Sequence, residues 1–289
     1  MCNLPKAVRR LWRFEIFPGI AALANLRSHR LGKLMGLSGS VEYLEVRHRG
    51  TTPCIRDHHR AWSYHEFTAR VDAAAAQLAA AGTGRGTTIA TLLPNRLELM
   101  VALMAVWRLG ATAAPVDPEI GRARAEQQIF GANALLVLDN RTILSPGLRL
   151  GGAPCMPVEI LPRRRPAAWQ TPPAPKADDI ALVYPEQGCR PAHSEIPHGD
   201  LDRLARQTTE HLGLTASAHC SISLPLVRAE VIAMNFLAAI LLGAPITLVT
   251  GRSGAPRTPA TRRPSVAYGL RTSPPSIHSS SRLAKGPAR

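Results

Sequence analysis

The chain has few aromatic residues, little lysine and no closely paired cysteines. Phenylalanine, tryptophan and tyrosine make up 4% of its 289 residues, so alanine and leucine must fill much of any interior. No Cys-x-x-Cys pair occurs, which argues against a zinc site and against a disulfide framework. This usage fits a reducing compartment, and we predict a cytoplasmic protein. The five cysteines are Cys2, Cys54, Cys155, Cys189 and Cys220.

Long apolar runs are also scarce, and only residues 231–249 are long enough to suggest a membrane span. Gly243 and Pro245 divide this run, and a helix followed by a buried strand explains it equally well, so we favour the buried interpretation. The start of the chain is basic and partly apolar, but Glu15 and Pro18 interrupt any signal-peptide core. Peripheral contact of this segment with an anionic membrane stays open as an alternative to a solvated helix.

Basic residues outnumber acidic ones by 35 to 20, which gives a formal net charge of +15. Such a balance is typical of proteins that bind nucleic acid. Only four of the basic residues are lysine, however, and the arginines are spread along the chain. No helix-turn-helix, zinc-finger or RNA-binding spacing accompanies them. A GC-rich coding sequence explains the arginine, alanine and proline content, so nucleic acid is not the partner we favour.

Expected strands and helices alternate along the chain, which predicts a layered α/β fold with parallel strands. The clearest helix covers residues 64–81, where Phe67 and Leu78 belong to an apolar stripe of helical spacing. Ser63 and Glu66 form an expected capping box at its start. Strands are predicted at 54–56, 61–64, 89–93, 111–116, 135–138, 179–184, 222–226 and 246–250, and further helices at 97–109, 123–130, 200–212 and 229–242.

Composition divides the chain into five expected parts. Residues 1–50 are expected to form a basic helical segment. Residues 51–144 are expected to form a first α/β subdomain built as a doubly wound sheet. A linker or surface excursion rich in proline and arginine, 145–177, precedes part of a second α/β subdomain, 178–250. Residues 251–289 contain eight basic residues, no acid and no periodicity, which predicts a disordered basic tail. Out-of-frame translation is an alternative explanation for this tail.

One stretch carries a family resemblance through the order of its parts. An aromatic start precedes an alanine-rich helix, a glycine turn, an apolar strand ending in Pro-Asn, a second helix and a run closing in Pro-Val-Asp-Pro. These parts are Trp62–Phe67, Gly82, Gly84, Gly86, Ile89–Asn95, Glu98–Leu109, Gly110–Ala111 and Pro115–Pro118. The order resembles the N-terminal half of the adenylate-forming (AMP-binding) acyl-CoA synthetases, which activate a carboxylic acid with ATP and transfer it to coenzyme A. The resemblance covers residues 60–250 and implies the layered doubly wound sheets of that family's N-terminal domain, here truncated.

The resemblance also indicates where ATP is held. In the family a loop reading roughly Thr-Ser-Gly-Thr-Thr-Gly-x-Pro-Lys-Gly follows a strand and precedes a helix, and its backbone N–H groups and lysine hold the triphosphate. Here residues 178–183 resemble that strand and residues 196–201 resemble the start of that helix. The resemblance therefore assigns cofactor binding to a degenerate phosphate loop with Gln187, Gly188, Arg190 and Pro191.

This loop departs from the family pattern in ways that weaken its hold on phosphate. Two family glycines and the family lysine are replaced by Glu186, Cys189 and Ala192. Pro185 removes an N–H donor, and Glu186 places a negative charge where phosphates would lie. Arg190 or His193 as a substitute cation is the alternative to loss of strong ATP binding.

The family's later landmarks are not found in residues 251–289. They are a Tyr-Gly-x-Thr-Glu segment that contacts adenine and magnesium, an aspartate for the ribose, and a small C-terminal domain with a catalytic lysine. No catalytic residue and no metal ligand is therefore assigned in this chain. The resemblance implies ATP, Mg²⁺ and coenzyme A as cofactors, and a fatty acid or related carboxylic acid as substrate. Long-chain acids are favoured because residues 95–98 and 224–226 resemble that branch.

Two functional interpretations follow from the sequence. The first is a fatty-acyl-CoA synthetase-like protein that is truncated and impaired in catalysis. The alternative is a non-catalytic basic binding protein whose tail engages nucleic acid or an acidic membrane.

Overall fold

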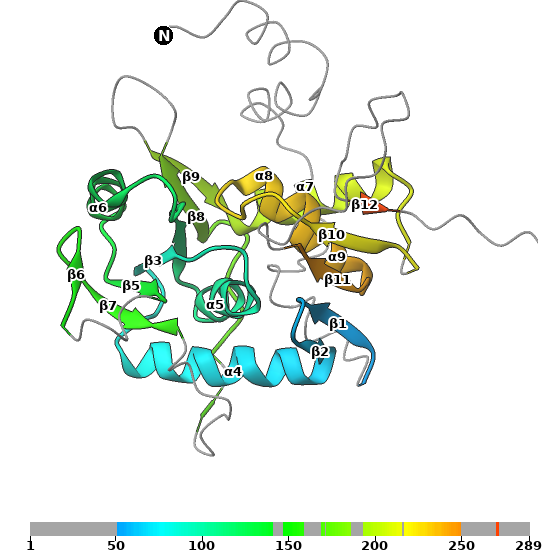
Figure 1. Ribbon diagram of the computed structural model, residues 1–289, viewed down its shortest axis with the longest axis horizontal. Coiled ribbons are helices and arrows are strands. Elements are labelled where there is room, and N and C mark those ends of the chain that lie inside the picture. Colours follow the sequence, from blue (N-terminus) through cyan, green and yellow to red (C-terminus); the bar gives the residue numbers. More distant parts are fainter. Residues whose placement is uncertain are drawn as a thin grey trace, which may run out of the picture. The chain divides into compact units, whose positions relative to one another are not determined.

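The computed structural model describes residues 51–140, 147–158, 169–170, 172–185, 193–215, 217–249 and 270–271 (Figure 1). All of them belong to one compact unit of the chain. The predicted helical segment at 1–50 and most of the predicted tail lie outside the described residues, as do residues 145–146, 159–168 and 171 of the predicted linker. Two β-sheets and the helices packed on them form a mixed α/β fold, as the sequence predicted.

The larger sheet has seven strands in the order β6-β7-β5-β3-β4-β8-β9. The five strands from β7 to β8 run parallel, while β6 and β9 pair antiparallel at the two edges. The strands are β3 (Thr88–Leu92), β4 (Thr112–Pro115), β5 (Leu136–Asp139), β6 (Arg149–Leu150), β7 (Ala153–Pro157), β8 (Ile180–Pro185) and β9 (His193–Pro197).

The smaller sheet has the order β12-β10-β11-β1-β2 and joins distant parts of the sequence. Its strands are β1 (Pro53–Arg56), β2 (Ala61–Ser63), β10 (His219–Ile222), β11 (Ile246–Leu248) and β12 (Leu270–Arg271). β1 and β2 form an antiparallel pair, and β1 also pairs parallel with β11, with Ile55 opposite Ile246. β1, the first described strand, therefore pairs with β11, one of the last.

The described helices are α4 (Tyr64–Ala80), α5 (Leu97–Arg108), α6 (Arg122–Gly131), α7 (His198–His211) and a continuous helical stretch of α8 (Ala229–Val231), η4 (Ile232–Leu237) and α9 (Ala238–Leu242). The predicted capping box starts α4: the Ser63 hydroxyl accepts from the Glu66 N–H, and the Glu66 carboxylate accepts from the Ser63 N–H. Gly82, with φ +87°, turns the chain away after the helix.

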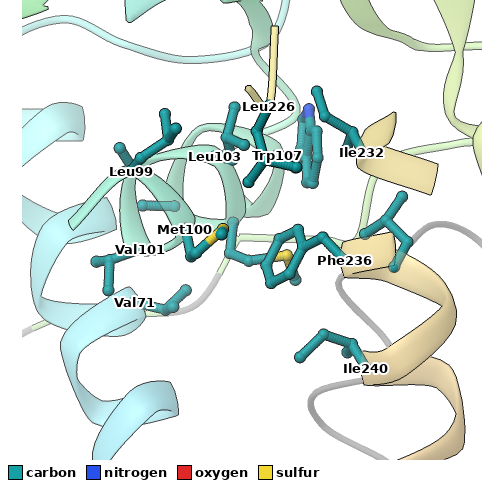
Figure 2. Packing of buried hydrophobic residues seen from close by; sticks show 14 of the residues in the cluster. Val71, Leu99, Met100, Val101, Leu103, Trp107, Leu226, Ile232, Phe236 and Ile240 are labelled. Carbon is teal, nitrogen blue, oxygen red and sulfur yellow. The ribbon is translucent and has the colours of Figure 1, made fainter. Parts of the chain in front are cut away.

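Most of the core lies around α5, which is buried on nearly every face. Figure 2 shows α5 between α4 and the α8–η4–α9 stretch, with Met100 and Trp107 directed towards Ile232 and Phe236. Each of these four side chains is fully buried, and their cluster includes residues of both sheets. A smaller cluster lies on the other side of β3, β4 and β5, against α6. The two sheets therefore share one apolar interior around α5.

The structure differs from the sequence predictions in several strands. The prediction of a strand at 222–226 is wrong, because β10 covers His219–Ile222 and ends where the predicted strand should begin. β7 lies within residues expected to form a linker, β9 was not predicted, and β12 lies within the tail expected to lack regular structure. Each sheet also combines strands from both predicted subdomains. β8, from the second, belongs to the larger sheet, and β1, from the first, belongs to the smaller one. Long-range pairing, which leaves little trace in local sequence, decides each of these cases.

The apolar run at 231–249 forms the end of α8, then η4, α9 and β11, as the buried interpretation predicted. Gly243 adopts a left-handed conformation, φ 69°, and ends the helix before the strand. Within the described ranges, no helix combines the length and apolar character needed to cross a bilayer.

The net charge is distributed unevenly over the chain. The described residues contain 14 lysines and arginines and 15 acidic residues, while the remaining residues contain 21 basic and 5 acidic ones. The respective net charges of −1 and +16 account for the total of +15. The basic character that suggested a polyanion partner therefore belongs to segments outside the described fold.

Candidate functional site

The carboxyl ends of β3, β4 and β8 lie side by side, because these strands are parallel neighbours. We call this side of the larger sheet, where the parallel strands end, its carboxyl edge. Ligands of parallel α/β sheets bind outside this edge. Asn95 follows β3, Asp117 follows β4, and residues 186–192 follow β8. Asp117 closes a local turn by accepting from the Glu119 N–H at 2.9 Å. The carboxyl edge of the larger sheet is therefore the candidate functional site.

The predicted phosphate loop connects β8 to β9 at the same edge. The two strands pair antiparallel as far as Pro185 opposite His193. The assigned residues Gln187, Gly188, Arg190 and Pro191 lie outside the described residues, so their role stays a prediction. The flanking strands β8 and β9 are described, and their antiparallel pairing places a hairpin connection where the family resemblance predicts the loop.

The base of this hairpin is fixed by hydrogen bonds from three other elements. The Trp107 indole N–H in α5 donates to the Ala181 carbonyl at 2.8 Å, and the Thr112 hydroxyl in β4 donates to the Ile180 carbonyl at 2.9 Å. At the start of α7, the His198 N–H donates to the Asp179 carbonyl at 3.0 Å. The end of the hairpin opposite the loop is therefore anchored to α5, β4 and α7.

The start of α7 lies at the amino end of β8, opposite the loop, and its first N–H groups are engaged there. Besides His198, the Gly199 N–H is also engaged, donating to the Ala177 carbonyl at 2.9 Å. A Cβ at Gly199 would lie 3.2 Å from the Ala177 Cβ, so glycine permits this close approach. Both N–H groups are thus satisfied by the segment before β8, and they anchor α7 to it.

His198 is an unusual side chain at the end of the β8–β9 hairpin opposite the loop. It is fully buried, and neither ring nitrogen has a hydrogen-bond partner within the described part of the chain. Its ring meets Trp107 edge-on, with 6.2 Å between ring centroids and 78° between ring planes. Burial lowers the pKa of His198 to about 4; Asp179 opposes this shift and Arg85 adds to it. The imidazole is therefore neutral at pH 7.

This pKa predicts a loss of stability in acid. The unfolded chain binds a proton at His198 below about pH 6.5, whereas the folded chain does so only below about pH 4. The free energy of unfolding therefore falls as the pH drops through this window, by about 3 kcal/mol from this group. His198→Phe should remove that part of the pH dependence. Urea denaturation followed by circular dichroism at pH 7, 5.5 and 4.5 measures it.

The exposed His58, in the β1–β2 hairpin, provides a matched control through His58→Gln. That variant should keep the acid sensitivity of the wild type. If His198→Phe and the wild type lose the same free energy between pH 7 and 4.5, His198 is not the buried acid-sensitive group.

A second part of the site comes from the smaller sheet. The side-chain amide of Asn95 donates to the Leu224 carbonyl at 2.6 Å, and its oxygen accepts from the Leu226 N–H at 3.0 Å. These bonds bring the exit of β10 to the end of β3. Sequence reasoning noted residues 95 and 224–226 separately, but no local signal indicated their contact.

The loop that would hold the phosphates of ATP departs from the family pattern. The loop sequence supplies Glu186 and no lysine. Across the ranges that the structure describes, no group of three or more His, Cys, Asp or Glu side chains is placed to hold a metal ion. The loop sequence therefore places a carboxylate, and no lysine, where the family holds the triphosphate.

A sequence profile of the AMP-binding enzyme family matches residues 44–251, which is well over half of the chain. The chain belongs to the AMP-binding enzyme family. Members of this adenylate-forming family use ATP and Mg²⁺ to activate carboxylic acids. The match confirms the resemblance inferred from the stretch between Trp62 and Pro118.

Relatives and solved structures agree with the family assignment. Syringomycin synthase SyrB1 of Pseudomonas syringae pv. syringae is 25% identical over 163 residues, which are 56% of this chain and 26% of that protein. The fatty acyl-adenylate ligase of L. pneumophila has a similar fold, with a TM-score of 0.66 and 19% identity over 73% of this chain and 39% of that one. The N-terminal subdomain of Klebsiella oxytoca NpsA gives a TM-score of 0.67 and 18% identity, covering 78% and 58%.

The chain spans about a quarter of SyrB1 and 39% of the L. pneumophila ligase. At these identities the structural likeness shows the fold of an AMP-binding N-terminal domain.

Proposed function

We propose that this AMP-binding family member is a fatty-acyl-CoA synthetase-like protein that retains an acid-binding edge and is impaired in its ATP-dependent step. The observation that carries the proposal is the β8–β9 hairpin. It opens at the carboxyl edge of β3, β4 and β8 on a rigid base, but its connecting loop carries Glu186 and lacks lysine. In this proposal the protein keeps the architecture of the family and has lost the charge that holds the triphosphate.

A long-chain acid is the proposed substrate class, with coenzyme A as the proposed acceptor. Leu224 lies at the same edge of the fold and is 55% exposed, which is unusual for a large apolar side chain. An aliphatic chain could cover it, whereas a polar acid would gain nothing from it. ATP, when bound, supplies the adenylyl group that activates the carboxylate, while Trp107, Thr112 and the α7 backbone hold the start of β8 in place.

Restoring the family residues should restore ATP binding. We expect no ATP–pyrophosphate exchange above the enzyme-free blank for the wild type with fatty acids of 8 to 18 carbons. The triple variant Glu186→Gly, Cys189→Gly and Ala192→Lys removes one negative charge from the loop and adds a cation. It should bind ATP more tightly by at least on the order of tenfold, as a gain of about 1.4 kcal/mol implies. Titration with a fluorescent ATP analogue measures the affinity.

The control is Arg122→Gln, which removes an exposed arginine on α6, outside the loop. It should leave ATP affinity unchanged. Exchange by the wild type with any fatty acid would overturn the impaired step, and equal ATP affinity in the triple variant would show that the three replacements do not limit binding.

We also propose a cytoplasmic location, from the cysteine usage, and peripheral membrane contact by the basic segment at the start of the chain. Polyanion binding is likewise proposed for the basic tail, since the described residues are close to electrically neutral.

A further inference from the structure

The smaller sheet carries a row of polar side chains across three neighbouring strands. Arg56 in β1 lies opposite Thr247 in β11, and Thr247 lies opposite Ser221 in β10 (Figure 1). The residues one position earlier on these strands belong to the buried core, and they are Ile55, Ile246 and Cys220. Since successive side chains of a strand point to opposite faces, the polar row lies on the outer face of the sheet, away from the core.

Hydrogen bonds join this row to His219, two residues before Ser221 on β10. The Arg56 Nε–H donates to the Thr247 hydroxyl oxygen at 2.8 Å, and His219 Nε2 lies 2.7 Å from the same oxygen. Burial and the positive charge of Arg56 lower the pKa of His219, so its imidazole is neutral at pH 7. The Thr247 hydroxyl, which accepts from Arg56, then donates to Nε2. This arrangement leaves the Nδ1–H of His219 as a further donor.

The positive charge of the cluster is not balanced by a carboxylate. Within the described part of the chain, Arg56 forms no ion pair, unlike Arg60, and its two Nη groups have no hydrogen-bond partner. Asp57 follows Arg56 in sequence, but its carboxylate accepts from the N–H groups of His59 and Arg60 in the turn between β1 and β2. The outer face therefore combines an uncompensated guanidinium with unused donors of neighbouring strands.

Charge and donor number indicate what occupies this face. The residues outside the described fold contain 21 basic and 5 acidic residues, so on average these segments share the sign of Arg56. An oxyanion has the opposite sign and consists of acceptors. A phosphate group offers three strong acceptor oxygens, one more than a carboxylate, and a guanidinium binds it with two parallel N–H donors. Donors from two strands, aligned on one face, match this chemistry.

We propose that the outer face of the smaller sheet binds the phosphate group of a phosphate monoester. Its donors are the Arg56 Nη groups, the Ser221 hydroxyl and the His219 Nδ1–H. Thr247 is a positioning residue, because its hydroxyl holds the guanidinium and the imidazole beside each other. The four side chains are exposed or half-buried, so the organic part of the ligand extends into solvent. The site belongs to the smaller sheet and does not depend on the function proposed for the carboxyl edge of the larger one.

Equilibrium dialysis of the full chain against radiolabelled glycerol 3-phosphate and, separately, inorganic phosphate tests the proposal at pH 7 and constant ionic strength. The wild type should bind glycerol 3-phosphate saturably. Arg56→Gln removes the guanidinium and should weaken this binding by on the order of tenfold, and Ser221→Ala should weaken it by about threefold. Arg124→Gln, at an exposed arginine of α6, changes the net charge equally and should match the wild type.

A conservative variant separates binding from folding. Arg56→Lys keeps the charge and loses the planar pair of donors, so its affinity should lie between those of Arg56→Gln and the wild type. Melting by circular dichroism identifies any variant that does not fold. If Arg56→Gln fails to fold, Arg56→Lys and Ser221→Ala test the site in its place.

Each outcome has a defined meaning. Equal affinity of Arg56→Gln and Arg124→Gln overturns the site, as does the absence of saturable binding to the wild type. Acetate that displaces the ligand as well as phosphate does would overturn the assignment to phosphate. Binding of inorganic phosphate alone, with the same dependence on Arg56, would support the oxyanion site and identify the free ion as its ligand. These measurements contain neither ATP nor a fatty acid, so their failure leaves the proposed function unchanged.

Discussion

Asp72→Ala is expected to lower the free energy of unfolding by about 3–5 kcal/mol, since it leaves a buried cation without its carboxylate. Arg108, the last residue of α5, forms an ion pair with Asp72 of α4 at 2.9 Å. The side chains are only 5% and 15% exposed. A guanidinium at the end of a helix also interacts favourably with the helix dipole, but that does not replace a lost partner. Urea denaturation at pH 7 measures the change.

The double variant Asp72→Leu and Arg108→Met tests the cause. Replacing both charges by apolar groups of similar volume should cost less than Asp72→Ala alone, because no charge is then buried. Glu126→Ala removes the partner of Arg122 in an exposed pair on α6 and should change stability by no more than about 0.5 kcal/mol. A loss of that small size for Asp72→Ala would mean that water reaches Arg108.

Trp107→Ala should lower the free energy of unfolding by a similar amount, about 3–5 kcal/mol, through the cavity it leaves. The indole is fully buried among Leu226, Ile232 and Phe236 (Figure 2), where α5 meets the α8–η4–α9 stretch. It also donates to the Ala181 carbonyl at the base of the hairpin. Equilibrium denaturation followed by circular dichroism measures the loss without relying on tryptophan fluorescence.

Trp107→Phe separates packing from the hydrogen bond. It retains most of the apolar volume and loses only the N–H donor, so a smaller loss of about 1–3 kcal/mol is expected. Phe130→Ala provides the control for an aromatic side chain that is 75% exposed, and it should stay within about 0.5 kcal/mol of the wild type. If Trp107→Ala and Phe130→Ala were equally mild, the core around α5 would have to be loosely packed.

Local signals predicted the elements whose causes are local. α4 begins and ends within one residue of its prediction because the apolar spacing, the capping box at Ser63 and the turn at Gly82 agree. α7 begins two residues before its predicted start. It has no side-chain cap, and its first N–H groups are satisfied by Asp179 and Ala177, which a sequence pattern does not reveal.

Tertiary contacts determined the rest. The strand expected at 222–226 is displaced because β10 pairs with β11, with Cys220 opposite Ile246. Beyond β10, the Asn95 amide forms the hydrogen bonds to the backbone of Leu224 and Leu226. The π-helical turn of η4 was not predicted either. The carbonyl of Asn235 in that turn accepts from the Cys220 thiol at 3.2 Å, a contact 15 residues away in sequence.

The candidate site was predicted in outline and not in detail. The strand before the loop and the helix after it were recognised from a family pattern, but β9 and the burial of His198 were not. A histidine at the start of a helix looks like a surface residue in sequence. Only the packing of Trp107 against it shows that it belongs to the interior.

The parallel pairing of β1 with β11 has a consequence for synthesis on the ribosome. Arg56 and Thr247 lie opposite each other in the sheet and are 191 residues apart in the chain. Among the described strands β1 leaves the exit tunnel first, and it can pair early only in the short hairpin with β2, which is marginal by itself. Cys54 and Ile55, buried in the finished sheet, lack their β11 neighbour until Ile246 has been translated. β1 thus waits for its parallel partner while nearly all of the described chain is made, and holdase chaperones have that interval in which to bind it.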